Sequence, residues 1–217
     1  MRRAAFLPVL AITLGGGVAT AQASDPLGFY FGGGVGQAGL RVDHAMLVGN
    51  AVDVAVASNP FSFSKHSTGW KIQLGLRPIS LVGAEVEYID FGNPSASYSG
   101  GSVHDFLSYQ ASIHAKAATA FAVLYAPIPV PLLDVYGKAG VARLHTTTTA
   151  TGTFGCLADC PLFGNVTFHR DDTAARFAYG LGVQMRLGRF AIRGEYERIS
   201  ASTGDPDLFS IGAIRNF

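Results

Sequence analysis

Charged side chains are scarce in this chain of 217 residues. Asp, Glu, Lys and Arg together make up 14% of it, against about 25% in an ordinary soluble domain. Long apolar runs are missing too, because nothing after the N-terminus approaches the roughly 18 apolar residues of a transmembrane helix. Disorder is excluded, since 48% of the residues are hydrophobic and can offset the ordering entropy. Abundant but dispersed apolar residues favour a β-barrel whose outer face meets lipid.

The first 23 residues have the features of a secretory signal peptide. Arg2-Arg3 gives a basic start, Ala4 to Leu14 an apolar core, and Ala21-Gln22-Ala23 a small-x-small cleavage site. The run Gly15-Gly16-Gly17 argues against an N-terminal anchor helix. We therefore expect cleavage after Ala23.

Cleavage changes the charge balance. The whole chain has 16 basic and 15 acidic residues, and loss of two arginines leaves 14 and 15, so the net charge changes from +1 to −1. A net charge so close to zero gives no reason to expect nucleic acid as a partner. Residues 24–217 are expected to form a single domain.

Only two cysteines are present, Cys156 and Cys160. An oxidising compartment favours a local disulfide between them that stiffens a loop tip. The alternative is a metal site completed by His145 or His169, but zinc sites need a second close pair of ligands that the sequence does not offer. The glycines from Gly34 to Gly39 have the spacing of a dinucleotide-binding fingerprint, but the residues that follow show no start of a helix, which that motif requires. We expect neither metal nor cofactor.

From Gly28 onward, apolar residues occupy alternate positions, as in lipid-facing barrel strands. Eight such segments are recognised. Their expected outward residues include Phe29, Phe31 and Val35; Thr68, Trp70, Ile72, Leu74 and Leu76; Val82, Ala84, Val86 and Tyr88; Leu133, Val135, Gly137, Ala139 and Val141; Phe177, Tyr179, Leu181, Val183, Met185 and Leu187; Phe190, Ile192, Gly194 and Tyr196; and Phe209, Ile211 and Ala213.

The longest segment runs from Tyr109 to Tyr125. Because it begins and ends in tyrosine, as aromatic girdles at two interfaces would require, its odd-numbered residues are expected to face outward. The expected inward set is Gln110, Ser112, His114, Lys116, Ala118, Ala120 and Ala122.

The connections between segments alternate in length. Short links are expected at residues 77–80, 126–132 and 188–189, and long ones near 40–64, 91–106, 145–172 and 200–206. This arrangement predicts an all-β, eight-stranded, antiparallel up-and-down transmembrane barrel with short periplasmic turns and long extracellular loops. A soluble barrel would instead have to bury the charges that occupy the alternate face.

Three stretches resemble the eight-stranded outer-membrane barrel family that includes the OmpA transmembrane domain and opacity-type surface proteins. They are Gly28 to Gly36 (GFYFGGGVG), Val82 to Gly92 (VGAEVEYIDFG) and the terminal Phe217. The resemblance implies a location in the cell outer membrane, with outer-membrane lipid and lipopolysaccharide around a monomeric barrel. It also implies that the barrel-assembly machinery reads Phe217.

Ten charged residues fall at expected inward positions, and an eight-stranded lumen is just wide enough for side chains. They are expected to pair and plug the barrel rather than line an ion pathway. The ten are Lys71, Glu85, Glu87, Lys116, Lys138, Arg176, Arg186, Arg193, Glu195 and Glu197.

No catalytic residues are expected. His66-Ser67 is the one adjacent His–Ser pair, and neighbouring side chains on a strand point to opposite faces. The sequence therefore predicts a structural, surface-interacting barrel whose outer loops meet an extracellular ligand. The alternative is a small passive conduit for ions or small solutes.

Overall fold

The computed structural model describes residues 28–42, 63–101, 105–156, 163–201 and 204–217. No helix in this part of the chain is long and apolar enough to cross a membrane. Its strands are β1 (Gly28–Val42), β2 (Phe63–Ile79), β3 (Val82–Asp90), β4 (Ser95–Gly101), β5 (Asp105–Tyr125), β6 (Leu133–Cys156), β7 (Phe163–Leu187), β8 (Phe190–Ser200) and β9 (Asp207–Asn216).

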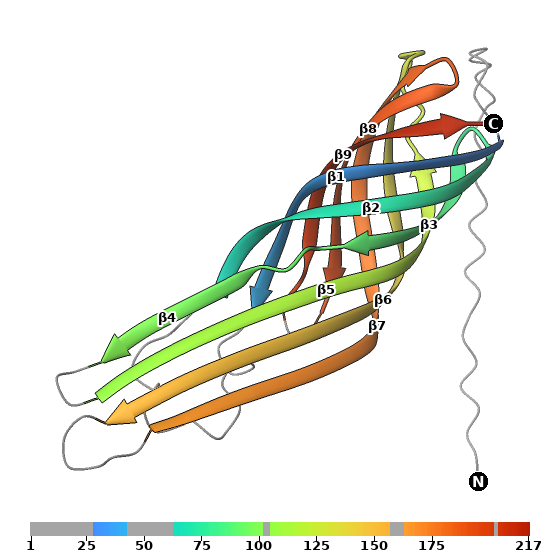
Figure 1. Cartoon of the computed structure of the whole chain (residues 1–217). Coiled ribbons are helices and arrows are strands. Elements are labelled where there is room, and N and C mark those ends of the chain that lie inside the picture. Colours follow the sequence, from blue (N-terminus) through green and yellow to red (C-terminus); the bar gives the residue numbers. More distant parts are fainter. Residues whose placement is uncertain (1–27, 43–62, 102–104, 157–162, 202–203) are drawn as a thin grey trace, which may run out of the picture.

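The strands form one antiparallel sheet that closes on itself (Figure 1). Apart from β3 and β4, strands that follow one another along the chain are paired, and β9 returns to pair with β1. Because β3 and β4 both pair with β5, they are two parts of one interrupted strand. The predicted eight-stranded antiparallel up-and-down barrel is confirmed.

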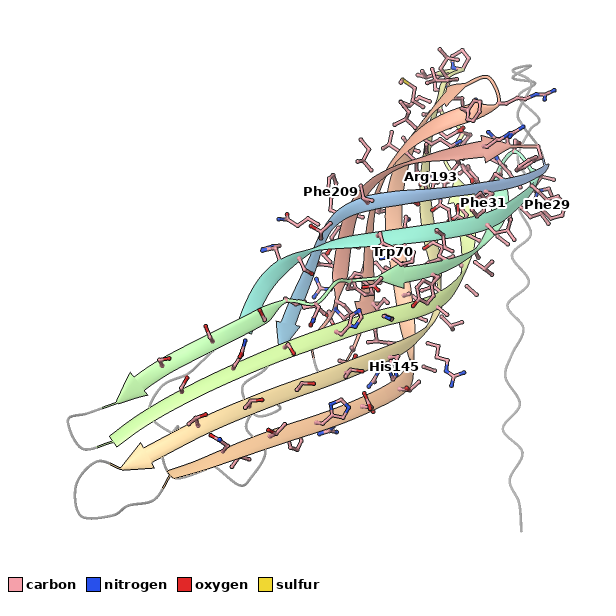
Figure 2. All side chains as sticks on the ribbon, viewed as in Figure 1. Phe29, Phe31, Trp70, His145, Arg193 and Phe209 are labelled. Carbon is pink, nitrogen blue, oxygen red and sulfur yellow. The ribbon has the colours of Figure 1, made fainter. Side chains whose placement is uncertain are left out.

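Side chains alternate between the lipid-facing wall and the lumen. On β3, for example, Val86 is 53% exposed whereas its neighbour Glu85 is 2% exposed. Figure 2 shows Phe29, Trp70 and Phe209 along the barrel wall, each of them an exposed aromatic residue. The apolar half of the alternation thus covers the outside of the barrel, as a membrane requires.

Short connections gather at one barrel end, called here the short-turn end. Residues 80–81 join β2 to β3, residues 126–132 join β5 to β6, and Gly188-Arg189 joins β7 to β8. Gly188 has φ +68°, a left-handed conformation that favours glycine in a two-residue turn. The two ends of the barrel sequence also meet here, because the Phe217 N–H donates to the Phe29 carbonyl at 3.0 Å.

At the opposite, long-hairpin end, two expected loops are largely strand. Residues 91–106 include β4, and residues 145–172 pair with each other from Thr146–Asp172 to Gly155–Phe163. The strands β4 to β7 therefore leave the barrel together as a projecting sheet (Figure 1). The loop prediction equated polar composition with loop, but β-branched threonines on an alternating pattern favour strand.

The prediction of which residues of β5 face outward is wrong. Phe121 is 4% exposed and Leu124 is 64% exposed, so the odd-numbered residues from 111 to 125 line the interior. Both faces of this strand are apolar or small near the short-turn end, so alternation alone does not show which face points into the lumen. The pairing with β3 shows it, because residues directly opposite each other on paired strands lie on the same side of the sheet, and Phe121 lies opposite the inward Glu85.

Candidate functional site

The centre of the lumen holds a cluster of buried charges around Lys138 of β6. Its Nζ lies 2.7 Å from Glu87 Oε1, 2.9 Å from Glu195 Oε1, 2.5 Å from Glu197 Oε1 and 3.5 Å from Glu85 Oε2. The two carboxylates on β3 and the two on β8 are each two residues apart, so each pair shares one face of its strand. One ammonium group thus joins opposite walls of the barrel.

Two further cations complete this cluster. Lys71 of β2 forms ion pairs with Glu195 and Glu197 and lies 3.5 Å from Glu87 Oε1. Arg193 of β8 pairs with Glu85 and lies 3.6 Å from Glu195 Oε1. Four carboxylates and three cations, all buried, are therefore held in one network, here called the central ion cluster.

Tyrosines and a glutamine add hydrogen bonds to the cluster, although Glu87 Oε2 and Glu197 Oε2 are buried without a hydrogen-bond partner. Tyr30 donates to Glu85 Oε1 at 2.5 Å, and Tyr136 donates to Glu195 Oε1 at 2.7 Å. The Arg193 guanidinium also donates to Gln184 Oε1 at 2.9 Å and lies 4.8 Å from the Tyr136 ring centroid. Removing one partner from such a network leaves a buried charge unpaired, which lowers the stability of the fold.

A second set of charges closes the short-turn end of the lumen. Arg77 and Arg186 each lie 3.4 Å from Asp134 Oδ2. The Arg77 guanidinium stacks 3.7 Å from the Tyr125 ring centroid. Arg77 and Asp134 were not among the ten predicted residues, although both occupy inward positions on strands whose alternation was recognised.

Beyond the central ion cluster, toward the long-hairpin end, the buried inward residues are mostly apolar, although half-buried Arg176 lies opposite Ala142 at this level. The next inward residue after Glu87 on β3 is Ile89, and the next after Glu197 on β8 is Ile199. The apolar layer is defined here by Ala38, Leu40, Ile89, Phe91, Ala115, Ala117, Ala142, Leu144, Ile199 and Leu208, all buried in one cluster. Charged and apolar side chains therefore fill successive levels of the lumen.

The structure brings seven of the ten predicted lumen residues together in the central ion cluster: Lys71, Glu85, Glu87, Lys138, Arg193, Glu195 and Glu197. Arg186 lies at the short-turn end with Asp134, and Arg176 is half-buried at an inward position of β7.

Lys116 was expected in the lumen, and this prediction is wrong. Its side chain is 39% exposed on the outside of β5, where Nζ lies 3.9 Å from Asp90 Oδ2. The error follows from the inverted faces of that strand.

Other predicted features lie outside the described residues. The export signal ending at Ala23 and Cys160, the partner expected for Cys156, belong to this group. Phe217 is described, and its side chain is 73% exposed.

Within the described part of the chain, one group of carboxylates is close enough to hold a metal ion. Ligand oxygens of Glu85, Glu87 and Glu195 lie within 4.8 Å of one another. The Lys138 ammonium already contacts all three residues. The geometry therefore suits an ion-pair network in which lysine supplies the positive charge.

The projecting sheet has a polar outer face that continues the lipid-facing side of the barrel wall. Thr147 donates to Asp171 Oδ1 at 2.7 Å, and His169 Nε2 lies 3.2 Å from Asp171 Oδ2. His145 Nδ1 contacts Thr173 Oγ1 at 2.8 Å (Figure 2). The hydrogen bond from Thr147, followed by the effect of His169, lowers the pKa of Asp171.

Comparison with known proteins identifies the barrel. The model of a family described as outer membrane protein beta-barrel domain matches residues 8–217. No curated protein matches the chain. Ail, the attachment invasion locus protein of Yersinia pestis, solved in complex with the heparin analogue sucrose octasulfate, is 15% identical, with 88% of this chain and 100% of that chain covered and a TM-score of 0.50. This likeness shows the fold.

Two structures from Pseudomonas aeruginosa are also similar. The N-terminal β-barrel domain of OprF is 11% identical, with 88% of this chain and 98% of that chain covered and a TM-score of 0.45. The outer membrane protein OprG is 10% identical, with 88% and 97% covered and a TM-score of 0.46.

Proposed function

The chain belongs to the outer membrane protein β-barrel family, and from this premise we propose that it is a sealed barrel that anchors a projecting sheet at the cell surface. Its short-turn end then faces the periplasm and its long-hairpin end the outside, as in other outer-membrane barrels. The sheet of β4 to β7 meets surface ligands, and the barrel holds it in place.

The observation that carries this proposal is the layered filling of the lumen. An ion crossing the barrel meets the central ion cluster, in which Lys138 bonds to carboxylates from two walls. It then meets the apolar layer, where Ile89 and Leu144 are buried. A charged barrier and an apolar barrier would both have to open for conduction.

The alternative is a small passive conduit for ions or small solutes. One observation favours it: among the described residues, Gln73 Oε1 and Thr119 Oγ1 are buried without a hydrogen-bond partner. Unsatisfied polar groups of this kind are the places where water enters a protein interior. Water at these two positions would still leave the apolar layer to be crossed.

Recording from single barrels in a planar lipid bilayer tests the proposal. The wild-type protein is expected to give no current steps. Leu144→Ala, which thins only the apolar layer, is expected to stay silent because the central ion cluster remains. Regular steps from the wild type, with an ion selectivity that changes in Lys138→Gln, would support the conduit instead.

Four narrower proposals concern processing, oligomeric state and activity. The export signal is cleaved after Ala23, Cys156 pairs with Cys160 in the mature protein, the barrel is a monomer, and it has no catalytic activity. The mass of unreduced protein from the membrane tests the first two together, because it reports both the N-terminus and the loss of two hydrogens. A mass that includes residues 1–23, or two free thiols, would contradict the corresponding proposal.

A further inference from the structure

The central ion cluster holds one more negative charge than positive. Its members are the carboxylates Glu85, Glu87, Glu195 and Glu197 and the cations Lys71, Lys138 and Arg193. At the short-turn end, Arg77 and Arg186 outnumber Asp134, but they donate to the Ser80 and Pro131 carbonyls of turns, at 3.2 and 2.7 Å. Arg176 lies opposite Ala142, at the level of the apolar layer. A buried charge without a counter-charge is so costly that the group changes its protonation instead.

The four carboxylates differ in how completely they are bonded. Glu85 and Glu195 each accept a hydrogen bond from a tyrosine, each pair with Arg193, and each have a partner for both oxygens. Glu87 and Glu197 contact lysines through Oε1 only. Among the described residues, the Oε2 atom of each is buried without a hydrogen-bond partner. The uncompensated charge therefore belongs to one of these two residues.

The neighbours across the sheet distinguish Glu87 from Glu197. Glu87 lies directly opposite Gln73 on β2 and directly opposite Thr119 on β5. Within the part of the chain that the structure describes, Gln73 Oε1 and Thr119 Oγ1 are also buried without a hydrogen-bond partner. Since opposite residues have Cβ atoms about 5 Å apart, three unpartnered polar side chains lie in one row across β2, β3 and β5. Glu197 instead lies opposite a glycine of β7 and a leucine of β9, which have no side-chain acceptor.

This row of polar side chains lacks a hydrogen-bond donor. The amide oxygen of Gln73 only accepts hydrogen bonds, and an ionised carboxylate also only accepts, so the two cannot bond to each other. A protonated carboxylic acid can donate through its O–H. A proton on Glu87 Oε2 therefore gives Gln73 Oε1 a partner without a water molecule, and it removes the excess negative charge of the cluster.

We propose that Glu87 is a proton-binding site in the lumen and is a neutral carboxylic acid in the folded barrel at neutral pH. The proton comes from water as the barrel folds, and the O–H points to the Gln73 amide oxygen. Three carboxylates then face three cations. The titratable and charged groups around the site are Tyr30, Lys71, Glu85, Tyr125, Tyr136, Lys138, Arg193, Glu195 and Glu197. The site is independent of what the projecting sheet binds.

The pH dependence of unfolding tests for the bound proton. In the unfolded chain Glu87 is ionised above about pH 5, so unfolding releases a proton that the folded barrel holds. Stability therefore falls as the pH rises. Between about pH 5.5 and 7.5, the unfolding constant of the wild type in urea is expected to rise about tenfold per pH unit relative to that of Glu87→Gln, a comparison in which the histidines cancel. A ratio that does not change with pH would overturn the proposal.

Matched carboxyl-to-amide variants locate the proton. At pH 7, Glu87→Gln keeps the shape of the side chain and removes no charge, so its urea midpoint is expected to equal or exceed that of the wild type. Glu85→Gln and Glu195→Gln each remove a carboxylate that is bonded through both oxygens, and both are expected to lower the midpoint. Equal losses in all three variants would overturn the assignment to Glu87.

Infrared spectroscopy detects the proton in the wild-type barrel itself. At pH 7 we expect the carbonyl stretch of a protonated carboxylic acid, shifted in protein refolded in D₂O and absent from Glu87→Gln. A folded wild type without this band would overturn the proposal even if every variant failed to fold.

Replacing sodium by choline at equal concentration distinguishes the proton from a metal cation. The urea midpoint of the wild type at pH 7 is expected to stay unchanged, because no sodium ion takes part. A midpoint that depends on sodium would show that a metal ion balances the charge, and Glu87 would then be ionised.

Discussion

At the scale of single residues, two lysines that look alike in the sequence have opposite environments. Lys138 is fully buried among four carboxylates, whereas Lys116 is 39% exposed beside one. Removing Lys138 leaves four buried carboxylates with only two cations, Lys71 and Arg193, while an exposed pair is screened by water. The two positions therefore form a matched test of the central ion cluster.

Lys138→Ala is expected to lower the free energy of unfolding by about 3–5 kcal/mol, because buried carboxylates lose their partner. Lys116→Ala removes the same atoms from an exposed pair and is expected to cost about 1 kcal/mol or less. Urea titration in micelles, followed by the gel mobility of folded and unfolded protein, measures both. Similar losses in the two variants would show that the cluster contributes no special stability.

A second residue-scale prediction concerns Asp171, which lies on the projecting sheet outside the membrane. Its lowered pKa means that this carboxylate favours the folded sheet above the unfolded-state pKa, and that the contribution is lost as the pH falls through the folded-state pKa. Thr147→Val removes the principal cause and is expected to raise the pKa of Asp171 toward its ordinary value. Carboxyl ¹³C NMR titration detects the change, with Thr148→Val as the control. An unchanged titration would mean that the Thr147 hydroxyl does not bond the carboxylate in solution.

At the scale of elements, β5 shows where a local pattern is insufficient. Its residues from 117 to 125 are apolar or small on both faces, so the period-two rule yields two acceptable orientations. The pairing with β3 selects one of them, because Phe121 faces Glu85 across the sheet. The large residues Phe121 and Tyr125 then fill the lumen, and the alanines face lipid.

This orientation predicts the accessibility of β5 to lipid. A fluorophore on Ala120→Cys is expected to be strongly quenched by brominated lipids, and one on Thr119→Cys is expected to be shielded, because Thr119 is 5% exposed. Fluorescence in bilayers of brominated and ordinary lipid gives the ratio. Quenching at position 119 but not at position 120 would restore the orientation expected from the tyrosines at 109 and 125.

At the scale of the whole molecule, the barrel closes by pairing of its first strand, β1, with its last, β9. The last described residue, Phe217, bonds to Phe29 through the backbone, while its ring is exposed and lies 5.1 Å from the Arg215 guanidinium. The ring therefore contributes little to packing and is available to another molecule. This arrangement is compatible with the recognition role that the family resemblance implies.

Deleting Phe217 is accordingly expected to lower the amount of folded barrel in the outer membrane several-fold while leaving refolding in micelles unchanged. Phe209→Ala, which removes another exposed aromatic ring from β9, is the control and is expected to assemble normally. Gel mobility of membrane fractions and of refolded protein measures both effects. A deletion variant that also fails to refold would assign Phe217 a structural role instead.

The sequence by itself determined the class of fold, the number of strands, the short turns and the face of most strands, because alternation along a strand is a local property of the chain. It also identified most of the lumen charges. Only the tertiary structure decided which charges meet, since Lys138 and Glu197 are 59 residues apart and come together through the register of several intervening strands. The faces of β5 and the extension of β4 to β7 beyond the barrel were decided in the same way: both depend on pairing between strands, which no single segment contains.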